Sequence, residues 1–404
     1  MCGDIIRDMN KTLMILQGGP VQANIVRLAK QMGLNTVVID RDPDAIGLKV
    51  ADVGEAVDVI DKKSALKVAI EHHIDGVLAG GDVSLPTAAY ISKKLGLICL
   101  TSDQAEIATN KELYYNLFNN NSIPYPKTRI VSTIEDCYNA IEDIGYPSII
   151  KPTTSFGGSR GVRRINDIKD VDESFHFAKI ASKNGRVMVE EFIDGEEHTV
   201  ESLILNGKNH VLAISDKERI SNMYCVATSL NYPSKLPEKT IRKMELIAQK
   251  VTDAIGLNNW ISHIEVITYK NDIKIIDFGA RGGGAGYIPT MIVPHISGVS
   301  MMEAFIQIIL AEKNDIKIIK QNTAVVYRFF TPNPGKIVEI QGIDKLEHID
   351  GLLDFHLNVN IGDYISEVNT QLDRAGYFVI KAKSLDLALE KAKEVEGLIK
   401  FITE

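Results

Sequence analysis

The sequence predicts an α/β region at the N-terminus, an α+β central region and a small α+β region at the C-terminus. Strand and helix signals alternate over the first hundred residues, and pairs of short strands follow from about residue 127. After about residue 320 come further strands and an amphipathic helix. Alternation is typical of a parallel sheet covered by helices, whereas paired strands indicate antiparallel sheet. The length of 404 residues suits two to four domains, and we expect three.

The first hundred residues predict a parallel sheet. The strands are expected at 12–19, 35–43, 76–80 and 97–101, and the helices at 21–34, 64–72 and 86–95. Gly18 and Gly19 lie at the first strand-to-helix turn, with Asp40 at the end of the next strand. The spacing G-x-G-x-x-G is absent, which favours a structural turn over a nicotinamide or flavin site. A dehydrogenase built on this region stays a minor alternative.

The rest of the chain predicts hairpins and helices. We expect hairpins of 146–152 with 162–168, 185–193 with 198–205, and 262–269 with 273–280. The helices are expected at 133–144, 167–182 and 238–255. Strands at 324–330 and 377–383 precede a last helix at 385–398, which has an apolar face.

Composition excludes several classes of protein. The chain has 45 Lys+Arg against 53 Asp+Glu, a net charge of −8, which argues against a dedicated nucleic-acid binder. No apolar run approaches the roughly 18 residues of a membrane helix, and the polar start lacks a signal-peptide core. Four scattered cysteines form no zinc motif and favour a reduced compartment. We therefore expect a cytoplasmic protein with small-molecule partners, no nucleic-acid or membrane partner, and a homodimer as one open oligomeric state.

A glycine-rich segment, TTSFGGSRGV (153–162), lies between two expected strands. Glycines and small hydroxyl residues allow successive backbone N–H groups to turn towards one anion. Lys151 on the preceding strand could neutralise phosphate charge. No G-x-x-x-x-G-K-[ST] motif is present, so this is not a Walker P-loop. A flexible hairpin tip is the alternative.

An acidic pair is expected in the hairpin 262–284. If Lys270–Asp272 forms a three-residue loop, Glu265 lies directly opposite Asp277 on one face, about 5 Å away. A two-residue turn would place the two carboxylates on opposite faces. Facing carboxylates repel each other unless a cation lies between them, and Mg²⁺ with substrate phosphates fits that role. Arg281 shares the face of Asp277 by period-2 spacing. A solvated acidic hairpin is the alternative.

A fourth segment, VMVEEFIDGEEHTVE (187–201), is an apolar strand that ends in acidic residues and turns at Asp194–Gly195. Backbone groups at such a strand end can pair with a flat base, and Glu197 could hold ribose hydroxyls. A hairpin with charged tips is an equal alternative when the segment is taken alone.

In order and spacing, these segments resemble the ATP-grasp superfamily, in particular its carboxylate–amine ligases, including L-amino-acid (dipeptide) ligases with a biotin-carboxylase-like architecture. The likeness covers nearly the whole chain. The matching segments are TNKELYYNLFNNNSIPYPK (109–127), YPSIIKP (146–152), SFGGSRGV (155–162), VEEFIDGEEHTVE (189–201), HIEV (263–266) and IIDFGARGGG (275–284).

The resemblance implies a pre-ATP-grasp domain over 1–108, an ATP-grasp domain over 109–318 and a C-terminal domain over 319–404. It places a lid subdomain at about 127–192, with ATP bound in a cleft between two α+β subdomains. The implied nucleotide-binding residues are Lys111, Lys151, Ser155, Gly157, Gly158, Ser159, Gly161, Glu190, Glu191, Phe192, Ile193 and Glu197. Glu265 and Asp277 match the acids that bind Mg²⁺, with Mn²⁺ as an alternative ion, and Arg281 matches the arginine that stabilises the transferring phosphoryl group.

The sequence departs from the family pattern at two positions. Asp277 replaces the commoner Glu of E-x-N-P-R, and Gly279 replaces its Asn. Glycine has no side chain to bind a metal, so occupancy by one or two metal ions stays open. Similar E-x-G-A-R variants occur among amino-acid-ligase-like members.

The implied reaction is phosphorylation of a carboxylate by ATP, followed by attack of an amine on the acyl phosphate, with release of ADP and phosphate. One alternative is a carboxylase-type enzyme that phosphorylates bicarbonate or formate, as in purine biosynthesis. Another is an ATP-binding module without turnover. The substrates themselves are not identified by the sequence. Arg219, Gly282 and Gly283 are the candidate substrate-binding residues.

Overall fold

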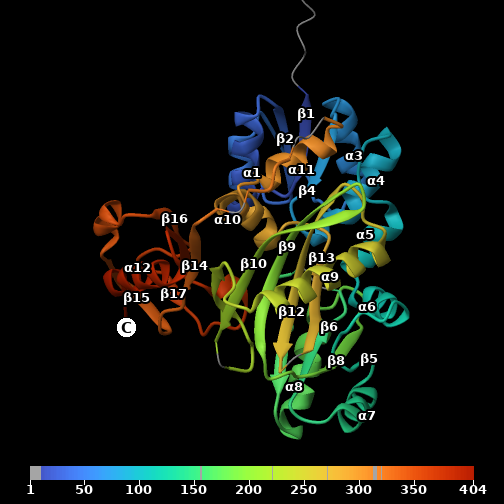
Figure 1. Cartoon of the computed structure of the whole chain (residues 1–404), viewed down its shortest axis with the longest axis vertical. Helices are drawn as coiled ribbons and strands as arrows, with labels where there is room; N and C mark the ends of the chain where they lie inside the picture. The colour runs from blue at the N-terminus through green and yellow to red at the C-terminus, as the bar shows by residue number, and fades with distance from the viewer. Residues whose placement is uncertain (1–10, 155–156, 221, 271, 313–315, 320) are drawn as a thin grey trace, which may run out of the picture.

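The computed structural model describes residues 11–154, 157–220, 222–270, 272–312, 316–319 and 321–404. Its parts are arranged around a long central sheet (Figure 1). The N-terminal sheet lies at one end of the molecule, the lid sheet at the other, and the C-terminal strands extend the central sheet sideways.

The N-terminal region forms a parallel sheet in the strand order β3-β2-β1-β4. Its elements are β1 Thr12–Leu16, α1 Pro20–Gln31, β2 Asn35–Asp40, α2 Ile46–Val50, β3 Val53–Ala56, α3 Lys62–Glu71, β4 Gly76–Ala79, a 3₁₀ turn Asp82–Ser84 and α4 Leu85–Leu95. The parallel sheet is confirmed, but the strand expected at 97–101 is wrong. That segment leads into α5, Ser102–Thr109, for which Thr101 caps the N-terminus by accepting from the backbone N–H of Gln104.

The edge strand of this sheet is instead β3, which the sequence did not predict. Only alternate residues of VGEA are half-buried, and Gly54 packs against the backbone of Leu48. A four-residue strand with so few apolar side chains gives a weak periodic signal.

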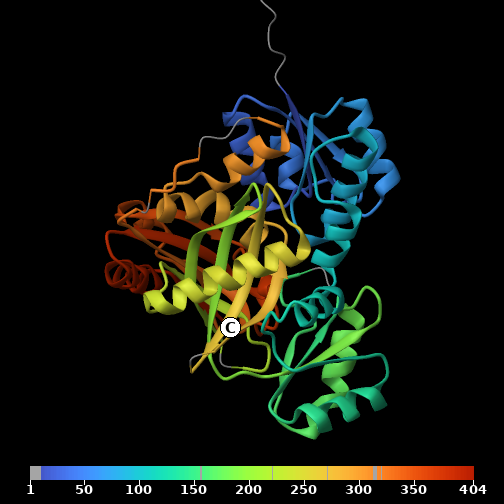
Figure 2. The same ribbon diagram turned by 45° about the vertical axis from the view of Figure 1, so that its right-hand side comes forward.

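The lid is a separate four-stranded antiparallel sheet in the order β5-β8-β6-β7. Figure 2 shows it as a distinct lobe below the central sheet. Its elements are β5 Thr128–Val131, α7 Ile134–Ile144, β6 Ser148–Pro152, β7 Arg163–Ile165, a 3₁₀ turn Ile168–Asp170, α8 Val171–Ala181 and β8 Val187–Glu191. The hairpin of β6 with β7 is confirmed.

The expected hairpin of 185–193 with 198–205 is wrong. β8 pairs with β5 and β6 in the lid, whereas β9, Glu196–Leu205, pairs with β10 and β12 in the central sheet. The turn at Asp194–Gly195 therefore carries the chain from one sheet to the other. A Cβ atom at Gly195 would lie 2.2 Å from the carbonyl oxygen of Thr268, so the crossing depends on glycine.

The central sheet has eight strands in the order β13-β12-β9-β10-β11-β14-β18-β16. Its further strands are β10 Lys208–Arg219, β11 Ala227–Tyr232, β12 Trp260–Tyr269, β13 Asp272–Gly279, β14 Ala324–Phe330, β16 Leu352–Leu357 and β18 Gly376–Ala382. The helices around it are α6 Lys111–Asn120, α9 Glu238–Ile255, α10 Val293–Ser297 and α11 Met301–Ile309. α9 buries Met244, Ala248 and Val251 in the core beneath β9 and β10.

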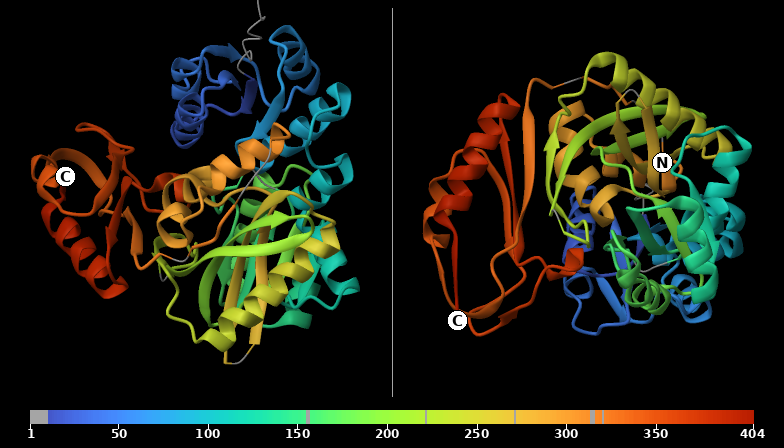
Figure 3. Two further views of the ribbon diagram at one scale, coloured as in Figure 1. Left: turned by 45° about the horizontal axis from the view of Figure 1, so that its top comes forward. Right: turned by 90° about the horizontal axis from the view of Figure 1, so that it is seen from below.

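The C-terminal region adds β14, β18 and β16 to that sheet, so its strands continue the central sheet. Its other elements are β15 Gly335–Gln341, a 3₁₀ turn Ile343–His348, β17 Tyr364–Ile365, a 3₁₀ turn Gln371–Asp373, α12 Leu385–Leu398 and β19 Lys400–Thr403. α12 covers the outer face of β14 and β18 (Figure 3) and buries Ala388, Ala392 and Val395. The domain boundaries at 108 and 318 remain predictions.

Across the described ranges, no single helix is long and apolar enough to cross a membrane. One helix pair, Ile288–Ser297 with Met301–Ile309, meets the length and composition test together but is bent by 119°.

Candidate active site

A cavity of about 690 Å³ lies where the N-terminal sheet, the lid, the central sheet and the C-terminal strands meet. Of the sequence-predicted residues, those that line it are Lys111, Lys151, Gly157, Gly158, Ser159, Glu190, Glu191, Phe192, Ile193, Glu197, Arg219, Glu265, Asp277 and Arg281. Gly161 packs instead on α8, where a Cβ atom would lie 2.6 Å from that of Ala181. Ser155 lies outside the described residues.

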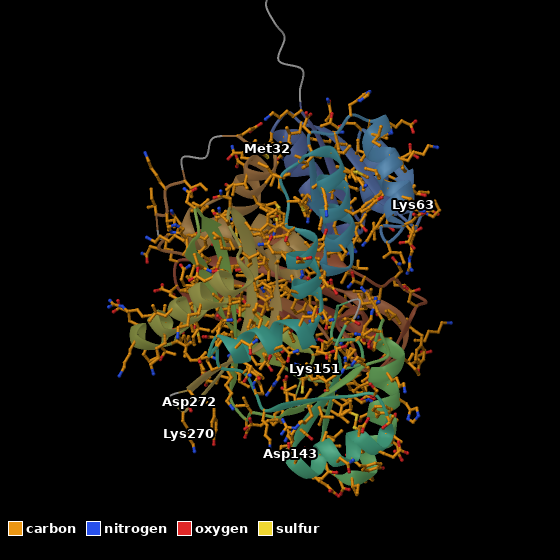
Figure 4. All side chains as sticks on the ribbon, turned by 90° about the vertical axis from the view of Figure 1, so that its right-hand side faces the viewer. Met32, Lys63, Asp143, Lys151, Lys270 and Asp272 are labelled. Atoms are coloured by element: carbon orange, nitrogen blue, oxygen red, sulfur yellow. The ribbon has the colours of Figure 1, made fainter. Side chains whose placement is uncertain are left out.

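The two acids face each other, but through a different turn from the expected one. Tyr269 pairs with Asp272, not with Ile273, so the connection is one residue shorter than in a three-residue loop. An irregularity in β13 then compensates, because Glu265 pairs with Asp277 while Val266 pairs with Ile275, and Ile276 is skipped. This bulge returns both carboxylates to one face. The tip of the β12–β13 hairpin, with Lys270 and Asp272, projects from the molecule (Figure 4).

The skipped residue is held by buried polar groups. The carbonyl oxygen of Ile276 accepts from Lys151 Nζ at 3.1 Å and from Tyr115 Oη at 3.0 Å. Lys151 also pairs with Glu190 at 2.8 Å, and Tyr115 Oη lies 3.1 Å from Glu190 Oε2, so its single hydrogen is shared between Glu190 and the Ile276 carbonyl. Lys151 is buried, and Figure 4 shows it between the lid and the rest of the molecule. The strand lysine thus ties the lid to the bulge that positions Asp277.

Asp277 lies beside two groups from α6. Its Oδ1 accepts from Lys111 Nζ and from Tyr114 Oη, the latter at 2.8 Å. Burial raises the pKa of Asp277, and so does the facing Glu265, but Lys111 and Lys151 together hold that pKa below its ordinary value. The carboxylate is therefore ionised and can serve as an oxygen ligand.

A chain of ion pairs connects Glu265 on β12 to Lys217 and Arg219 on β10. Lys217 Nζ lies 2.7 Å from Glu265 Oε2 and 2.9 Å from Glu197 Oε2, and Arg219 pairs with the other oxygen of Glu197. Burial raises the pKa of Glu265, but Lys217 and His263 hold it well below its usual range. Arg219, expected among the substrate-binding residues, thus lies beside the expected ribose carboxylate.

A buried pair links β9 and β12 to the glycine loop after β13. His263 Nδ1 lies 2.5 Å from Glu201 Oε1, and Glu201 Oε2 accepts the N–H of Gly283 at 3.1 Å. Burial lowers the pKa of His263, but Glu201 and Glu265 more than offset burial and raise the pKa to about 9. Gly282 and Gly283 are both buried and do not line the main cavity. Gly283 is required here, since a Cβ atom would lie 2.2 Å from Glu201 Oε1.

Arg281 points into the cavity and is paired across it. Its Nε and Nη2 each lie 3.0 Å from a different oxygen of Asp82, which follows β4 in the N-terminal sheet. Burial lowers the pKa of Arg281, but Asp82 raises it above its ordinary value. Gly279 leaves room for this side chain, because a Cβ atom there would lie 3.3 Å from Arg281 Cζ.

The glycine-rich lid segment has left-handed backbone conformations at three successive residues. Gly157, Gly158 and Ser159 have positive φ angles of 78°, 72° and 59°. The segment touches the C-terminal region, where the N–H of Gln371 donates to the carbonyl of Gly158 at 3.1 Å.

Among the described residues no group of three or more His, Cys, Asp or Glu is arranged to hold a metal ion. Glu265 and Asp277 are a pair of oxygen donors that face each other at the cavity wall. A pair of this kind suits Mg²⁺ that is also bound by substrate phosphates, because that ion takes one or two carboxylates and completes its shell from phosphates and water.

Two family models match the chain. The ATP-grasp domain matches residues 144–288, and the L-amino acid ligase C-terminal domain 2 matches residues 328–404. The chain thus carries an ATP-grasp domain followed by the C-terminal domain of L-amino acid ligases. The resemblance drawn from the motifs is therefore confirmed, as is the class of enzyme, an ATP-binding ligase that forms a carbon–nitrogen bond.

Curated relatives are distant. An alanine–anticapsin ligase of Bacillus subtilis strain 168 is 26% identical over 272 residues, which cover 62% of this chain and 57% of the relative. The carbamoyl phosphate synthase large chain of Clostridium botulinum strain Kyoto is 21% identical over 329 residues, 76% of this chain but 30% of that protein. The ligase thus spans only part of either relative.

Solved structures share the whole fold. An L-amino acid ligase from Bacillus licheniformis superposes with a TM-score of 0.85 at 21% identity, covering 98% of this chain and 99% of the other. N5-carboxyaminoimidazole ribonucleotide synthetase from Thermotoga maritima gives 0.74 at 20% identity, covering 98% and 100%.

Several site residues of the ligase were missed by sequence reasoning. Asp82, Glu201 and Tyr115 each act on a residue far away in the sequence. Asp82 lies outside every matching segment, whereas Glu201 and Tyr115 lie within the segments 189–201 and 109–127, where neither was given a role. Glu201 offered one signal, because period-2 spacing places it on the same face of its strand as Glu197. Arg374 also lines the cavity, and no motif marked it.

Proposed function

We propose that the protein activates an amino-acid carboxylate with ATP and joins it to the amine of a second amino acid, with release of ADP and phosphate. The observation that carries this proposal is the meeting of Glu265, Asp277 and Arg281 in one cavity with the nucleotide-binding candidates. The C-terminal ligase domain supports amide formation over other ATP-grasp reactions.

In this proposal the nucleotide lies between the lid and the central sheet. Residues Glu190–Ile193 bound the cavity where the lid strand β8 ends, which suits adenine, and Glu197 suits the ribose. Lys111 and Lys151 supply positive charge for the phosphates, and the Gly157–Ser159 backbone covers them. Lys111 exchanges its bond with Asp277 for one with phosphate when the nucleotide binds.

Glu265 and Asp277 would hold Mg²⁺, or Mn²⁺, against the phosphates. When bound, the ion neutralises phosphate charge and orients the terminal phosphoryl group. Gly279 contributes no ligand, which favours a site with fewer protein donors than the commoner Asn-containing pattern. Lys217 keeps Glu265 ionised in the absence of the metal.

Arg281 donates to the phosphoryl oxygens as they are transferred to the substrate carboxylate. Its pairing with Asp82 holds the guanidinium in place before the substrates bind, which lowers the cost of reorganisation during the reaction. The amine then attacks the acyl carbon, and phosphate leaves with one oxygen of the original carboxylate. Enclosure between lid, central sheet and C-terminal strands limits hydrolysis of the acyl phosphate.

The test is a screen for ADP release with pairs of the common L-amino acids, in Mg²⁺ or Mn²⁺, followed by mass spectrometry of the product. Bicarbonate and formate, each with an aminoimidazole ribonucleotide, serve as controls for carboxylase-type chemistry. A product that weighs the sum of two amino acids less one water supports the proposal. ADP release with bicarbonate or formate and with no amino-acid pair would overturn it, as would nucleotide binding without any turnover.

A further inference from the structure

Most cations that line the cavity already have a carboxylate partner in the protein. The paired cations are Lys111, Lys151, Lys217, Arg219 and Arg281. Within the described ranges, Arg160 and Arg374 are the two lining cations without one. Arg160 lies in the lid and is half-buried, whereas Arg374 is only 8% exposed. Arg374 is thus a buried positive charge with no negative partner.

The guanidinium of Arg374 is held in a fixed orientation. Its Nε donates to the carbonyl of Gln371 at 2.8 Å, and Nη1 donates to the carbonyl of Ala227 at 3.4 Å. The ring of Phe329 covers one face, with its centroid 3.6 Å from Cζ. Among the described residues Nη2 has no hydrogen-bond partner. Three elements therefore fix the side chain and leave one edge of it without partners at the cavity wall.

A charge buried in this way is costly unless an anion joins it. Burial lowers the pKa of Arg374 to about 10, which reflects the missing partner. The remaining N–H groups are arranged for a carboxylate, since a guanidinium edge donates two parallel hydrogen bonds to its two oxygens.

The position of Arg374 indicates which anion of the proposed reaction it would bind. The phosphates are served by the lysines of α6 and β6, and the carboxylate to be phosphorylated must lie by Arg281 and Asp277. A second amino acid brings a second carboxylate, which the reaction does not consume. The same cavity is lined by Tyr327, Phe329 and Tyr377, which offer aromatic surface to an apolar or aromatic side chain of the substrate.

We infer that Arg374 binds the α-carboxylate of the acceptor, the amino acid whose amine attacks the acyl phosphate. The enzyme would thereby prefer amino acids to simple amines as acceptors. This inference rests on the proposed function, because only a ligase that joins two amino acids presents such a carboxylate. It assigns an acceptor-binding residue to the C-terminal region, in place of Arg219, which is occupied by Glu197.

The test compares wild type, Arg374→Gln and Arg374→Lys with each active acceptor and with its carboxamide, in which the α-carboxylate charge is removed. We expect Arg374→Gln to raise the KM for the amino acid by roughly 10–100-fold, the scale of hydrogen bonds to a charged group. The KM values for ATP and for the carboxamide should change less than twofold. Arg374→Lys, which keeps the charge but loses the fork, should give an intermediate KM and serves if the glutamine variant does not fold.

Arg328→Gln is the matched control, because Arg328 lies on β14 and pairs with Glu396 and Glu218 away from the cavity lining. Equal KM increases for amino acid and carboxamide, an unchanged KM for the amino acid, or an increase only for ATP would each overturn the inference. If wild type releases no ADP with any amino-acid pair, the proposed function fails first and the inference with it. Ligation by wild type with no selective effect at Arg374 refutes the inference alone.

Discussion

Glu265 lies directly opposite Asp277 on neighbouring antiparallel strands, and a bulge at Ile276 is what brings the two carboxylates to one face. The carbonyl of the bulged residue bonds to Lys151 and Tyr115, so the acidic pair depends on side chains from the lid and from α6. The geometry expected to bind the metal is therefore coupled to the lid that is expected to cover the nucleotide.

Removing the carboxylate of Asp277 should remove metal-dependent turnover. Asp277→Asn leaves Glu265 as the sole acid of the pair, so we expect amino-acid-dependent ADP release to fall below detection. Asp272→Asn at the exposed tip of the same strand is the matched control and should retain wild-type rates. Persistent turnover in Asp277→Asn would show that the acid pair does not bind the metal.

Arg281 should affect the rate more than binding. If it donates to the transferring phosphoryl group, Arg281→Ala lowers kcat on the order of 10²–10³-fold, with a small change in the KM for ATP. Asp82→Asn should lower kcat less, because Asp82 positions Arg281 without touching the substrates in this account. Steady-state ADP release measures both. A near wild-type kcat in Arg281→Ala contradicts the role.

Tyr115 should stabilise the protein through the bulge. Tyr115→Phe removes the hydroxyl whose hydrogen is shared between Glu190 and the Ile276 carbonyl, both buried, and should cost about 1–3 kcal/mol in the free energy of unfolding. Tyr125, whose ring stacks on Tyr115 at 4.9 Å, provides the control Tyr125→Phe, expected within about 0.5 kcal/mol of wild type. Urea denaturation gives both values. Equal effects of the two variants would contradict the assignment.

Gly283→Ala should disrupt the buried Glu201–His263 pair. The added methyl group would lie 2.2 Å from Glu201 Oε1 and 2.7 Å from His263 Nδ1, so we expect a loss of about 1–3 kcal/mol in stability. Gly397→Ala in α12 meets no atom within 4 Å and should instead stabilise the protein by about 0.5–1 kcal/mol. Thermal unfolding compares them, and an unaffected Gly283→Ala would mean that the loop has room to move.

Asp216 should contribute stability that is lost in acid. Burial raises its pKa, but hydrogen bonds from His198, Ser234 and the backbone N–H of Lys235 together outweigh burial and lower the pKa below the ordinary 3.8. A group with a lowered folded-state pKa stabilises the fold above the ordinary value and ceases to do so as the pH falls through the folded one. The destabilisation by Asp216→Asn should therefore be full above about pH 4 and shrink below it. Exposed Asp386→Asn is the control, and a deficit that persists at lower pH would contradict this.

Local patterns predicted much of the fold and the order of the site motifs. The parallel N-terminal sheet, the β6–β7 and β12–β13 hairpins and the bounds of α9 and α12 follow from periodicity and turn residues. The pairing of Glu265 with Asp277 was predicted through a loop that the structure does not have. A bulge that depends on Lys151 and Tyr115 is a tertiary feature, and it leaves no signal in the hairpin itself.

The remaining site features could not be read from the sequence because they depend on distant partners. Arg281 was placed by strand spacing, but its partner Asp82 comes from another sheet. The segments before and after Asp194 were predicted to form a hairpin because both have strong strand signals, yet they belong to different sheets. Arg374 lies outside every motif, and its inferred role depends on its lack of a carboxylate partner among the described residues, which only the tertiary structure shows.

The most direct test of the central claim follows oxygen through the reaction. The amino acid whose carboxylate is activated is labelled with ¹⁸O in that carboxylate. The proposed acyl phosphate then passes one labelled oxygen to phosphate when the amine of the second amino acid attacks. We predict that the inorganic phosphate released by wild type carries one ¹⁸O atom per amide formed, measured by mass spectrometry. Phosphate that contains no ¹⁸O while amide accumulates would contradict the acyl-phosphate mechanism.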